Sequence, residues 1–354
     1  MQTFLISKRL LRLAPLSAAL LSGVGLTHAQ SMSPAQFVEA CRTSPANTVV
    51  LREQTKFQTS FEGTTFQTPT GCTVVLAPGA SFDLDTITMQ FGGPFVVQAS
   101  GSGGVVLDKA TLRATSVALN LTGFEGKFQM NTARLAATTG DVAIQFGEKG
   151  FMEIKDSGRW YQPRLTARGR LSIAAGASFT GSIIQSGLQG TTGISFAFNG
   201  ADSGLKIEGS DLLLTSGASN GAPYITGPFT VTGTAPKVGF EMINVNLIEA
   251  TQAVTVALNG AESKLGWMQV RSQTSSRRIS LTAMGEKGEV KVENALMYGL
   301  PEVVIESGAM GSVSVTNSPG SITASQLIRV RAGLGGSCSA STQGLIAPVL
   351  QVCR

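Results

Sequence analysis

The chain has 354 residues, of which 14% are charged and 6% aromatic, and its formal net charge is +5. An ordinary soluble domain carries about 25% charged residues, so the composition favours strands with polar but uncharged outer faces. The only histidine, His28, lies in the leader sequence predicted below. A mature chain without histidine excludes a Ser-His-Asp triad, a Cys-His pair and a histidine-ligated metal.

The first 29 residues have the features of a secretory signal peptide. Basic residues between positions 8 and 12 precede an apolar run over 13–26, and residues 27–29 form a small-x-small cleavage site. The run is shorter than the roughly 20 residues of a membrane-spanning helix, so we expect cleavage before Gln30, secretion, and no transmembrane span in the mature chain. Cleavage leaves 24 basic and 22 acidic residues, an excess too small to favour nucleic acid as a partner.

Four cysteines remain, at positions 41, 72, 338 and 353. An even number in an exported chain indicates disulfides, and four cysteines permit three pairings. Two lie near the start and two near the end, so we expect Cys41–Cys72 and Cys338–Cys353. Free or metal-binding thiols are disfavoured, because CxxC spacing and mature histidine are both missing.

A repeated pattern follows the second cysteine. Residues 84–89, 107–112 and 130–135 match at a constant step of 23: an apolar residue, then Asp or Asn, then a further apolar pair two residues later. Repeats of this length bury an apolar face only by stacking, which predicts an all-β fold, a parallel β-solenoid. We expect an N-terminal cap over 30–72, a β-helix over 73–332 and a C-terminal cap over 333–354, with both ends stapled by disulfides. A tandem β-sandwich is the weaker alternative, because its repeats run to about 100 residues.

Two features carry a resemblance to a known family. The segment from Ala40-Cys41 to residues 71–80, with strand-rich sequence between, resembles the first turns of secreted right-handed parallel β-helix proteins, the pectate-lyase-like superfamily. The series Asp85, Asp108 and Asn131 is similar to the Asn ladder at a tight corner of that fold. The family contains lyases, glycoside hydrolases, epimerases and non-enzymatic surface proteins, so the resemblance implies a fold and leaves the activity open.

One candidate site is acidic. Asp83 and Asp85 are two residues apart on a predicted strand, and Asp108 would stack one coil above Asp85. Three carboxylates at such distances could hold Ca²⁺, and Arg113 could supply the base of a calcium-dependent lyase. The alternative is a structural corner ladder, in which Asp and Asn adopt unusual backbone angles and cap their own turn; Asn131 in the third repeat favours this ladder.

The second candidate site is rich in arginine and aromatic residues. The stretch 159–170 concentrates basic and aromatic side chains in an otherwise charge-poor chain, and a second tryptophan also has arginines nearby. Aromatic rings stack on sugars, and guanidinium groups bind carboxylates or sulfates. We therefore expect an acidic polysaccharide as ligand. The predicted contact residues are Arg159, Trp160, Tyr161, Arg164, Arg168, Arg170, Trp267 and Arg271. In the alternative, Trp160 packs against the solenoid and the arginines are solvated.

These patterns favour a secreted, non-enzymatic β-solenoid that presents a binding or assembly surface without a cofactor. Its expected partner is an acidic polysaccharide or a cell-envelope component, as for an adhesin, in the periplasm, at the cell surface or outside the cell. A polysaccharide lyase using Asp83, Asp85, Asp108 and Arg113 is the first alternative. An extracellular filament or matrix subunit that self-assembles is the second.

Overall fold

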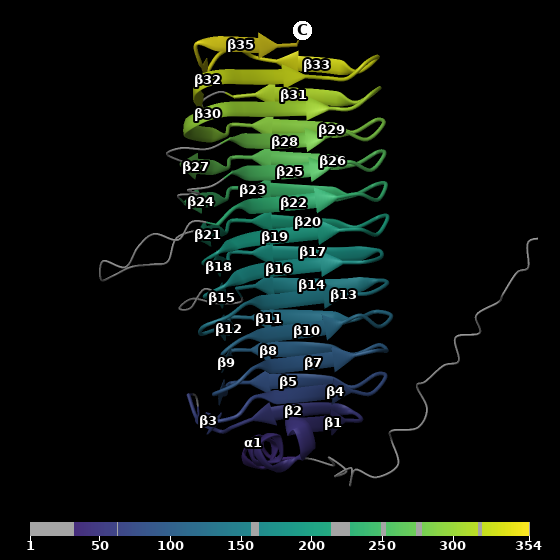
Figure 1. The fold of residues 1–354 in the computed structure, drawn as a ribbon, viewed down its shortest axis with the longest axis vertical. Coiled ribbons are helices and arrows are strands. Elements are labelled where there is room, and N and C mark those ends of the chain that lie inside the picture. The colour runs from purple at the N-terminus through teal and green to yellow at the C-terminus, as the bar shows by residue number, and fades with distance from the viewer. Residues whose placement is uncertain are drawn as a thin grey trace, which may run out of the picture.

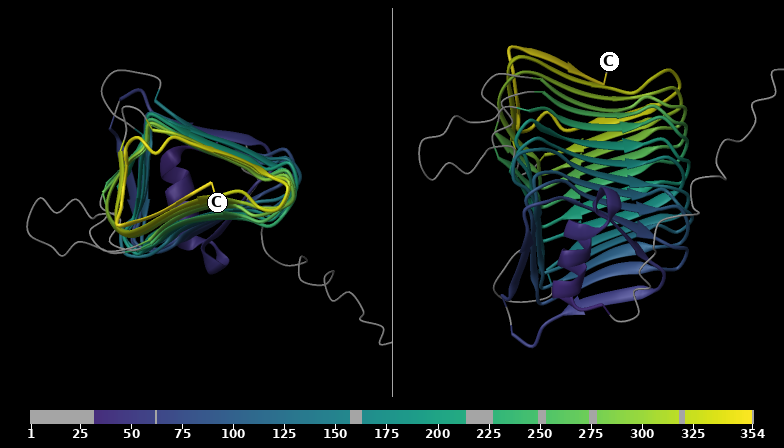
Figure 2. Two further views of the ribbon diagram at one scale, coloured as in Figure 1. Left: turned by 90° about the horizontal axis from the view of Figure 1, so that it is seen from above. Right: turned by 60° about the horizontal axis from the view of Figure 1, so that its bottom comes forward.

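The computed structural model describes residues 32–61, 63–156, 163–213, 227–248, 253–273, 278–317 and 321–353. These residues form a parallel β-helix, an upright stack of coils with one helix at its lower end (Figure 1). Seen along the long axis, the coil has a triangular outline (Figure 2). The prediction of an all-β solenoid is confirmed, and no helix among the described residues is long and apolar enough to span a membrane.

Each coil contributes one strand to each of three walls, which we number in chain order. Wall 1 contains β1 (Thr48–Leu51), β4 (Cys72–Leu76), β7 (Phe95–Ala99), β10 (Val117–Leu121), β13 (Val142–Phe146), β16 (Arg170–Ala175), β19 (Gly193–Phe198), β22 (Phe229–Gly233), β25 (Val254–Leu258), β28 (Ile279–Ala283) and β35 (Val349–Val352). Wall 2 is a separate sheet of β2 (Gln54–Gln58), β5 (Ser81–Asp85), β8 (Gly104–Asp108), β11 (Lys127–Asn131), β14 (Gly150–Lys155), β17 (Phe179–Ile184), β20 (Gly204–Glu208), β23 (Gly239–Ile243), β26 (Lys264–Met268), β29 (Glu289–Glu293), β31 (Ser312–Thr316) and β33 (Ser337–Ala340). Wall 3 contains β3 (Thr65–Thr68), β6 (Thr88–Phe91), β9 (Thr111–Ala114), β12 (Arg134–Ala137), β15 (Arg164–Ala167), β18 (Gly187–Gly190), β21 (Asp211–Leu213), β24 (Asn246–Ile248), β27 (Arg271–Gln273) and β34 (Leu345–Ile346). The long strands β30 (Leu296–Ser307) and β32 (Ser321–Arg331) run from wall 3 into wall 1.

The core runs along the axis of the coil. Side chains alternate inward and outward along each strand, and equivalent inward residues of successive coils stack. Phe82, Val105 and Phe128 form one such stack on wall 2. At the lower end Phe37 of the terminal helix packs against Phe57 and Phe82, with ring centroids 4.7 and 5.4 Å apart. A coil of this size has too little area to bury an apolar face alone, so stacking on its neighbours supplies the core.

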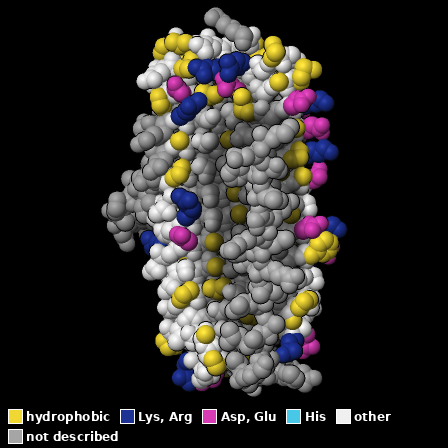
Figure 3. All heavy atoms as spheres, turned by 45° about the vertical axis from the view of Figure 1, so that its right-hand side comes forward, with side chains coloured by type: hydrophobic (Ala, Val, Ile, Leu, Met, Phe, Trp, Pro, Cys, Tyr) yellow, Lys and Arg dark blue, Asp and Glu magenta, His cyan; other side chains and the backbone are white. Residues whose placement is uncertain are grey.

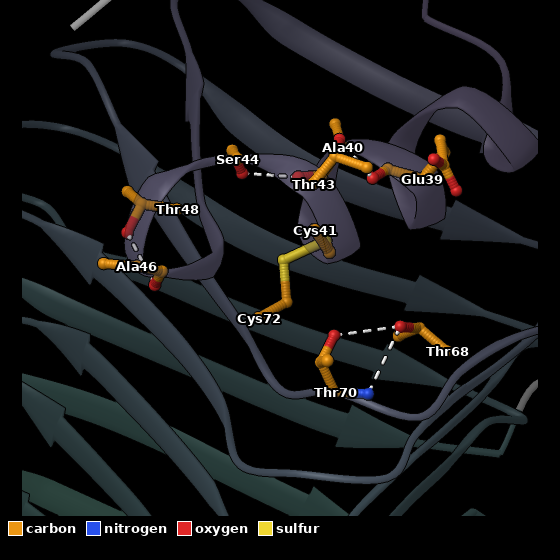
Figure 4. The surroundings of a disulfide bond; sticks show 10 residues. All are labelled: Glu39, Ala40, Cys41, Thr43, Ser44, Ala46, Thr48, Thr68, Thr70 and Cys72. Atoms are coloured by element: carbon orange, nitrogen blue, oxygen red, sulfur yellow. Dashed lines mark hydrogen bonds between the residues drawn. A yellow bond between two sulfur atoms is a disulfide. The ribbon is translucent and has the colours of Figure 1, made fainter.

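The lower end is closed by a short amphipathic helix, α1 (Pro34–Thr43), followed by the 3-10 turn η1 (Pro45–Asn47). Ser33 and Gln36 form a capping box at its start, and Pro34 occupies the first helical turn. The helix buries Phe37 and Cys41 against the first coils. Figure 4 shows the disulfide from Cys41 to Cys72, which ties α1 to β4.

Both predicted disulfides are confirmed, since the second joins Cys338 to Cys353 at the upper end. Disulfides of this kind persist outside the reducing cytoplasm. The strand ladders start at β1 and continue through β33, β34 and β35. Residues on both sides of positions 72 and 332 therefore belong to the β-helix.

Candidate functional site

Three arginines lie on neighbouring strands of wall 3. These strands, β9, β12 and β15, are at the left of Figure 1. Arg113 lies on β9, Arg134 on β12 and Arg164 on β15, and Arg134 is paired directly with Arg164 in the ladder. Arg113 lies one strand below Arg134 and two residues further along. Because adjacent strands are about 4.8 Å apart, the three arginines start from neighbouring backbone positions on one wall. With Arg168 and Arg170 they form what we call the arginine face.

A repeated local sequence builds this surface. The strands carry a leucine at their second position, Leu112, Leu135, Leu165 and Leu188, which pair in register and are buried. With the leucine turned into the core, strand alternation turns its two neighbours outward. Those outward positions hold arginine, threonine, alanine, glycine or glutamine.

Arg168 and Arg170 extend the arginine face around the corner into wall 1. Both are exposed. The backbone N–H of Arg168 donates to Ala137 O at 3.2 Å, and that of Arg170 donates to Asp141 Oδ1 at 2.8 Å. A side chain at Gly169 would overlap the Asp141 carboxylate, so glycine lets the backbone of this turn approach that carboxylate closely. Asp141 thus bonds to the backbone of the corner.

The strands that carry the arginine face are poor in acidic residues. Strands β9, β12, β15 and β18 contain no Asp or Glu, and among the described residues Arg113, Arg164, Arg168 and Arg170 form no salt bridge. Asp141 is the acidic residue at the adjoining corner. The stem of Arg164 lies over Gly187 of the next coil, where an added Cβ would stand 3.5 Å from Arg164 Cγ. The aliphatic part of Arg164 therefore packs close to the backbone of the neighbouring coil.

The other predicted contact residues divide into three groups. Arg159, Trp160 and Tyr161 lie outside the described residues. Arg271 is exposed at the start of β27, in the same column of wall 3 as Arg164, four strands or about 20 Å further along the axis. Trp267 is fully buried, because alternation on β26 turns it into the core. The prediction that Trp267 contacts a surface ligand is therefore wrong.

The acidic candidate site is a structural ladder on wall 2. Asp85 pairs in register with Asp108, and Asp108 with Asn131. Asn131 Nδ2 donates to Asp108 Oδ1 at 2.8 Å, and Lys56 Nζ lies 2.7 Å from Asp85 Oδ2. The hydrogen bond from Lys56, followed by that from the Thr86 hydroxyl, lowers the pKa of Asp85. The predicted stacking is confirmed.

These contacts engage the carboxylates that the calcium and lyase alternatives would use at this place. Asp83 is buried and accepts a hydrogen bond from Gln54 at 2.8 Å, while Asp85 and Asp108 are engaged within the ladder. Within the described part of the chain, no group of three carboxylate, cysteine or histidine side chains is arranged to hold a metal ion. Arg113 belongs to wall 3, so the predicted base and the carboxylates lie on different walls.

The unusual backbone angles fall one residue later than expected. Positive φ occurs at Thr86, Lys109 and Thr132, with values of 58°, 48° and 49°. The residues of the Asp85 ladder end their strands in extended conformation, and the following residue makes the turn. The expectation that the Asp and Asn residues themselves adopt these angles is wrong.

Wall 2 carries most of its charge in pairs. Lys155 lies 3.0 Å from Glu153, Lys206 2.7 Å from Glu208, and Lys291 2.9 Å from Glu293 (oxygen to nitrogen). In Figure 3 basic and acidic side chains lie beside one another along the right-hand border of the rod. Exposed pairs of this kind add little net charge to a surface, so wall 2 contrasts with the arginine face.

Sequence reasoning missed Arg134, although a signal was present. Residues 134–137 read Arg-Leu-Ala-Ala and residues 164–167 read Arg-Leu-Thr-Ala, so aligning the two segments would have placed one arginine above the other. The same reasoning grouped Arg113 with the aspartates and not with the arginines.

The fold and the site rest on the geometry of this chain itself. No family model matches the sequence, and no curated protein or solved structure is significantly similar to it.

Proposed function

We propose that this chain is a secreted, non-enzymatic β-helix protein that binds an acidic polysaccharide through the arginine face. The observation that carries the proposal is the stacking of Arg113, Arg134 and Arg164 on three adjacent strands that contain no carboxylate. Guanidinium groups form bidentate, charge-assisted hydrogen bonds with carboxylate and sulfate groups. A row of them at regular strand spacing suits a polymer that repeats its anionic group better than it suits a single ion.

The proposed export of the chain supports, as its ligand, a glycan of the cell envelope or of the medium around the cell. The signal-peptide pattern of residues 1–29 and the two disulfides agree with export, and the destination is the periplasm, the cell surface or the medium. The small net charge of the mature chain disfavours nucleic acid, whose binding relies on many phosphate contacts. The parallel β-helix fold supports the further proposal of a relation to the pectate-lyase-like superfamily, and specifically to that group's non-enzymatic members.

A direct assay distinguishes the binding proposal from the alternative of a polysaccharide lyase. A polysaccharide lyase produces unsaturated uronates, which absorb in the ultraviolet. We expect no such absorbance when the purified protein is incubated with polygalacturonate and Ca²⁺. Its steady appearance, lost in an Arg113→Ala variant, would replace the binding proposal with a lyase.

Binding is tested by isothermal titration with polygalacturonate at fixed salt, with neutral dextran as the comparison polymer. We expect the variant Arg113→Ala/Arg164→Ala/Arg168→Ala to lose about tenfold or more in affinity, the equivalent of one strong charged contact. A variant with Lys206, Lys264 and Lys291 changed to alanine removes the same charge from wall 2 and should bind within about twofold of wild type. Equal losses in both variants, or no binding by wild type, would refute the proposal.

Trp160 is tested separately, because it precedes Arg164, Arg168 and Arg170 closely in the sequence. Trp160→Ala should weaken binding if its ring stacks on a sugar. Trp267→Phe is the matched control, since Trp267 is buried; it should bind as wild type does.

A further inference from the structure

The two ends of the β-helix are built differently. At the lower end, α1 covers the first coil and places Phe37 on the core. At the upper end, β33, β34 and β35 each pair only with a strand of the coil below. Within the described residues nothing covers their outer edges, which lie at the top of Figure 1. We call β33, β34, β35 and Leu334 the C-terminal edge.

The C-terminal edge is apolar as well as unpaired. Leu334 is 91% exposed, Ile346 59% and Val349 47%. Inward residues of the last coil, including Leu350 and Val352, are only partly buried, because no further coil packs on them. Exposed strand edges of this kind pair readily with other strands, and monomeric proteins usually protect them with charge or a covering element.

Little charge lies along the strands of this end, between Arg331 and Arg354 in the sequence. Residues 332–353 contain no Asp, Glu, Lys or Arg. The nearest charges in the described coil below are Arg329 and Arg331, which lie 3.8 and 3.3 Å from Glu306 and are partly neutralised by it. Two copies of this edge can therefore face one another without strong repulsion between like charges.

We propose that the C-terminal edge is the interface of a two-fold dimer, in which a second copy of this chain docks by its own C-terminal edge. A two-fold axis perpendicular to the rod reverses the strand direction, so the edge strands of the two copies pair antiparallel. Each copy supplies the unpaired N–H and C=O groups that the other needs. The lower end cannot serve as the partner surface, because α1 covers it, and the assembly closes at two chains without forming a filament.

The oligomeric state tests this inference independently of polysaccharide binding. Light scattering after size exclusion, from about 1 to about 100 µM protein, should show twice the monomer mass at the higher concentrations. Small-angle scattering should give a maximum dimension about twice that of one rod. A monomer at every concentration, a side-by-side dimer or an extending filament would each overturn the proposal.

Matched variants locate the interface. Ile346→Lys/Val349→Lys places charge on the C-terminal edge and should give a monomer with an unchanged circular dichroism spectrum. Leu334→Glu repeats the test on the turn before β33, in case the double variant fails to fold. Phe61→Lys/Met284→Lys changes exposed apolar residues elsewhere (79% and 44% exposed) and should remain dimeric. A dimer that survives the edge variants would contradict the proposal, as would a monomeric wild type that binds only a strand from another protein.

Discussion

The ring of Phe37 lies on that of Phe57, with centroids 4.7 Å apart. This contact joins the capping helix to the first coil, and Phe82 of the second coil touches both rings. By burying these rings, α1 takes the place of a further coil, which would otherwise have to cover the apolar core beneath the first coil. The helix therefore stabilises the lower end and also prevents it from pairing with other chains.

Replacing Phe37 with alanine should destabilise the protein by about 3–5 kcal/mol, through lost burial and an unfilled cavity. The variant should also aggregate, because the first coil loses its cover. Urea denaturation followed by circular dichroism measures the first effect, and light scattering the second. Arg42→Ala, at an exposed ion pair of the same helix, should change little; an equal loss there would mean that the Phe37 contact is not what stabilises the cap.

Much of the fold was predictable from the sequence because it repeats. The 23-residue step placed Asp85, Asp108 and Asn131 in one column, and the structure confirms that register. The helix α1 was not predicted. It occurs once in the chain and lies outside the repeats, so comparing one repeat with the next could not reveal it. The N-terminal cap was predicted to extend to Cys72 and the C-terminal cap to begin at Gly333. Strand pairing of β1 with β4 begins at Thr48.

A glycine at the corner between walls 1 and 2 should be essential for stacking. A Cβ at Gly260 would overlap the backbone carbonyl of Ala235 in the coil below, and backbone cannot move aside as a side chain can. Gly260→Ala should therefore cost about 1–3 kcal/mol or more in thermal or urea unfolding. At Gly239 an added Cβ meets nothing within 4 Å, so Gly239→Ala should be neutral or slightly stabilising. Equal effects at the two positions would argue against the coil-to-coil packing.

The Lys56–Asp85 pair should make stability depend on acid pH. Hydrogen bonds from Lys56 and Thr86 hold the folded-state pKa of Asp85 below its ordinary value of 3.8. A group of this kind contributes stability above its unfolded pKa and loses it as the pH falls through the folded value. Asp85→Asn should thus lower the melting temperature slightly at pH 7, and the difference from wild type should shrink below about pH 4.

Melting curves of wild type and Asp85→Asn between neutral pH and strong acid provide the measurement. Asp202→Asn, at an exposed corner, is the control and should follow wild type throughout. A difference for Asp85→Asn that stays constant down to about pH 2 would show that the pair does not titrate as described.

The candidate site was predictable only in part. Composition singled out Arg164, Arg168 and Arg170, and the structure brings them near one another. Trp267 was misplaced, because proximity to arginines in sequence does not reveal which way a strand residue points; the alternation of Leu265 and Trp267 was the better guide. Arg113 and Arg134 join the cluster only through strand pairing between coils, which composition does not record.

The affinity for polygalacturonate of Arg164→Ala, compared with that of Arg278→Ala, tests the central claim most directly. Each change removes one exposed guanidinium group, but Arg164 belongs to the arginine face, whereas Arg278 already pairs with Glu302 at 3.4 Å. We predict that Arg164→Ala weakens binding about fivefold or more and that Arg278→Ala leaves it unchanged, since a charged contact to ligand is stronger than an exposed ion pair. Equal affinities for the two variants would contradict binding at the arginine face.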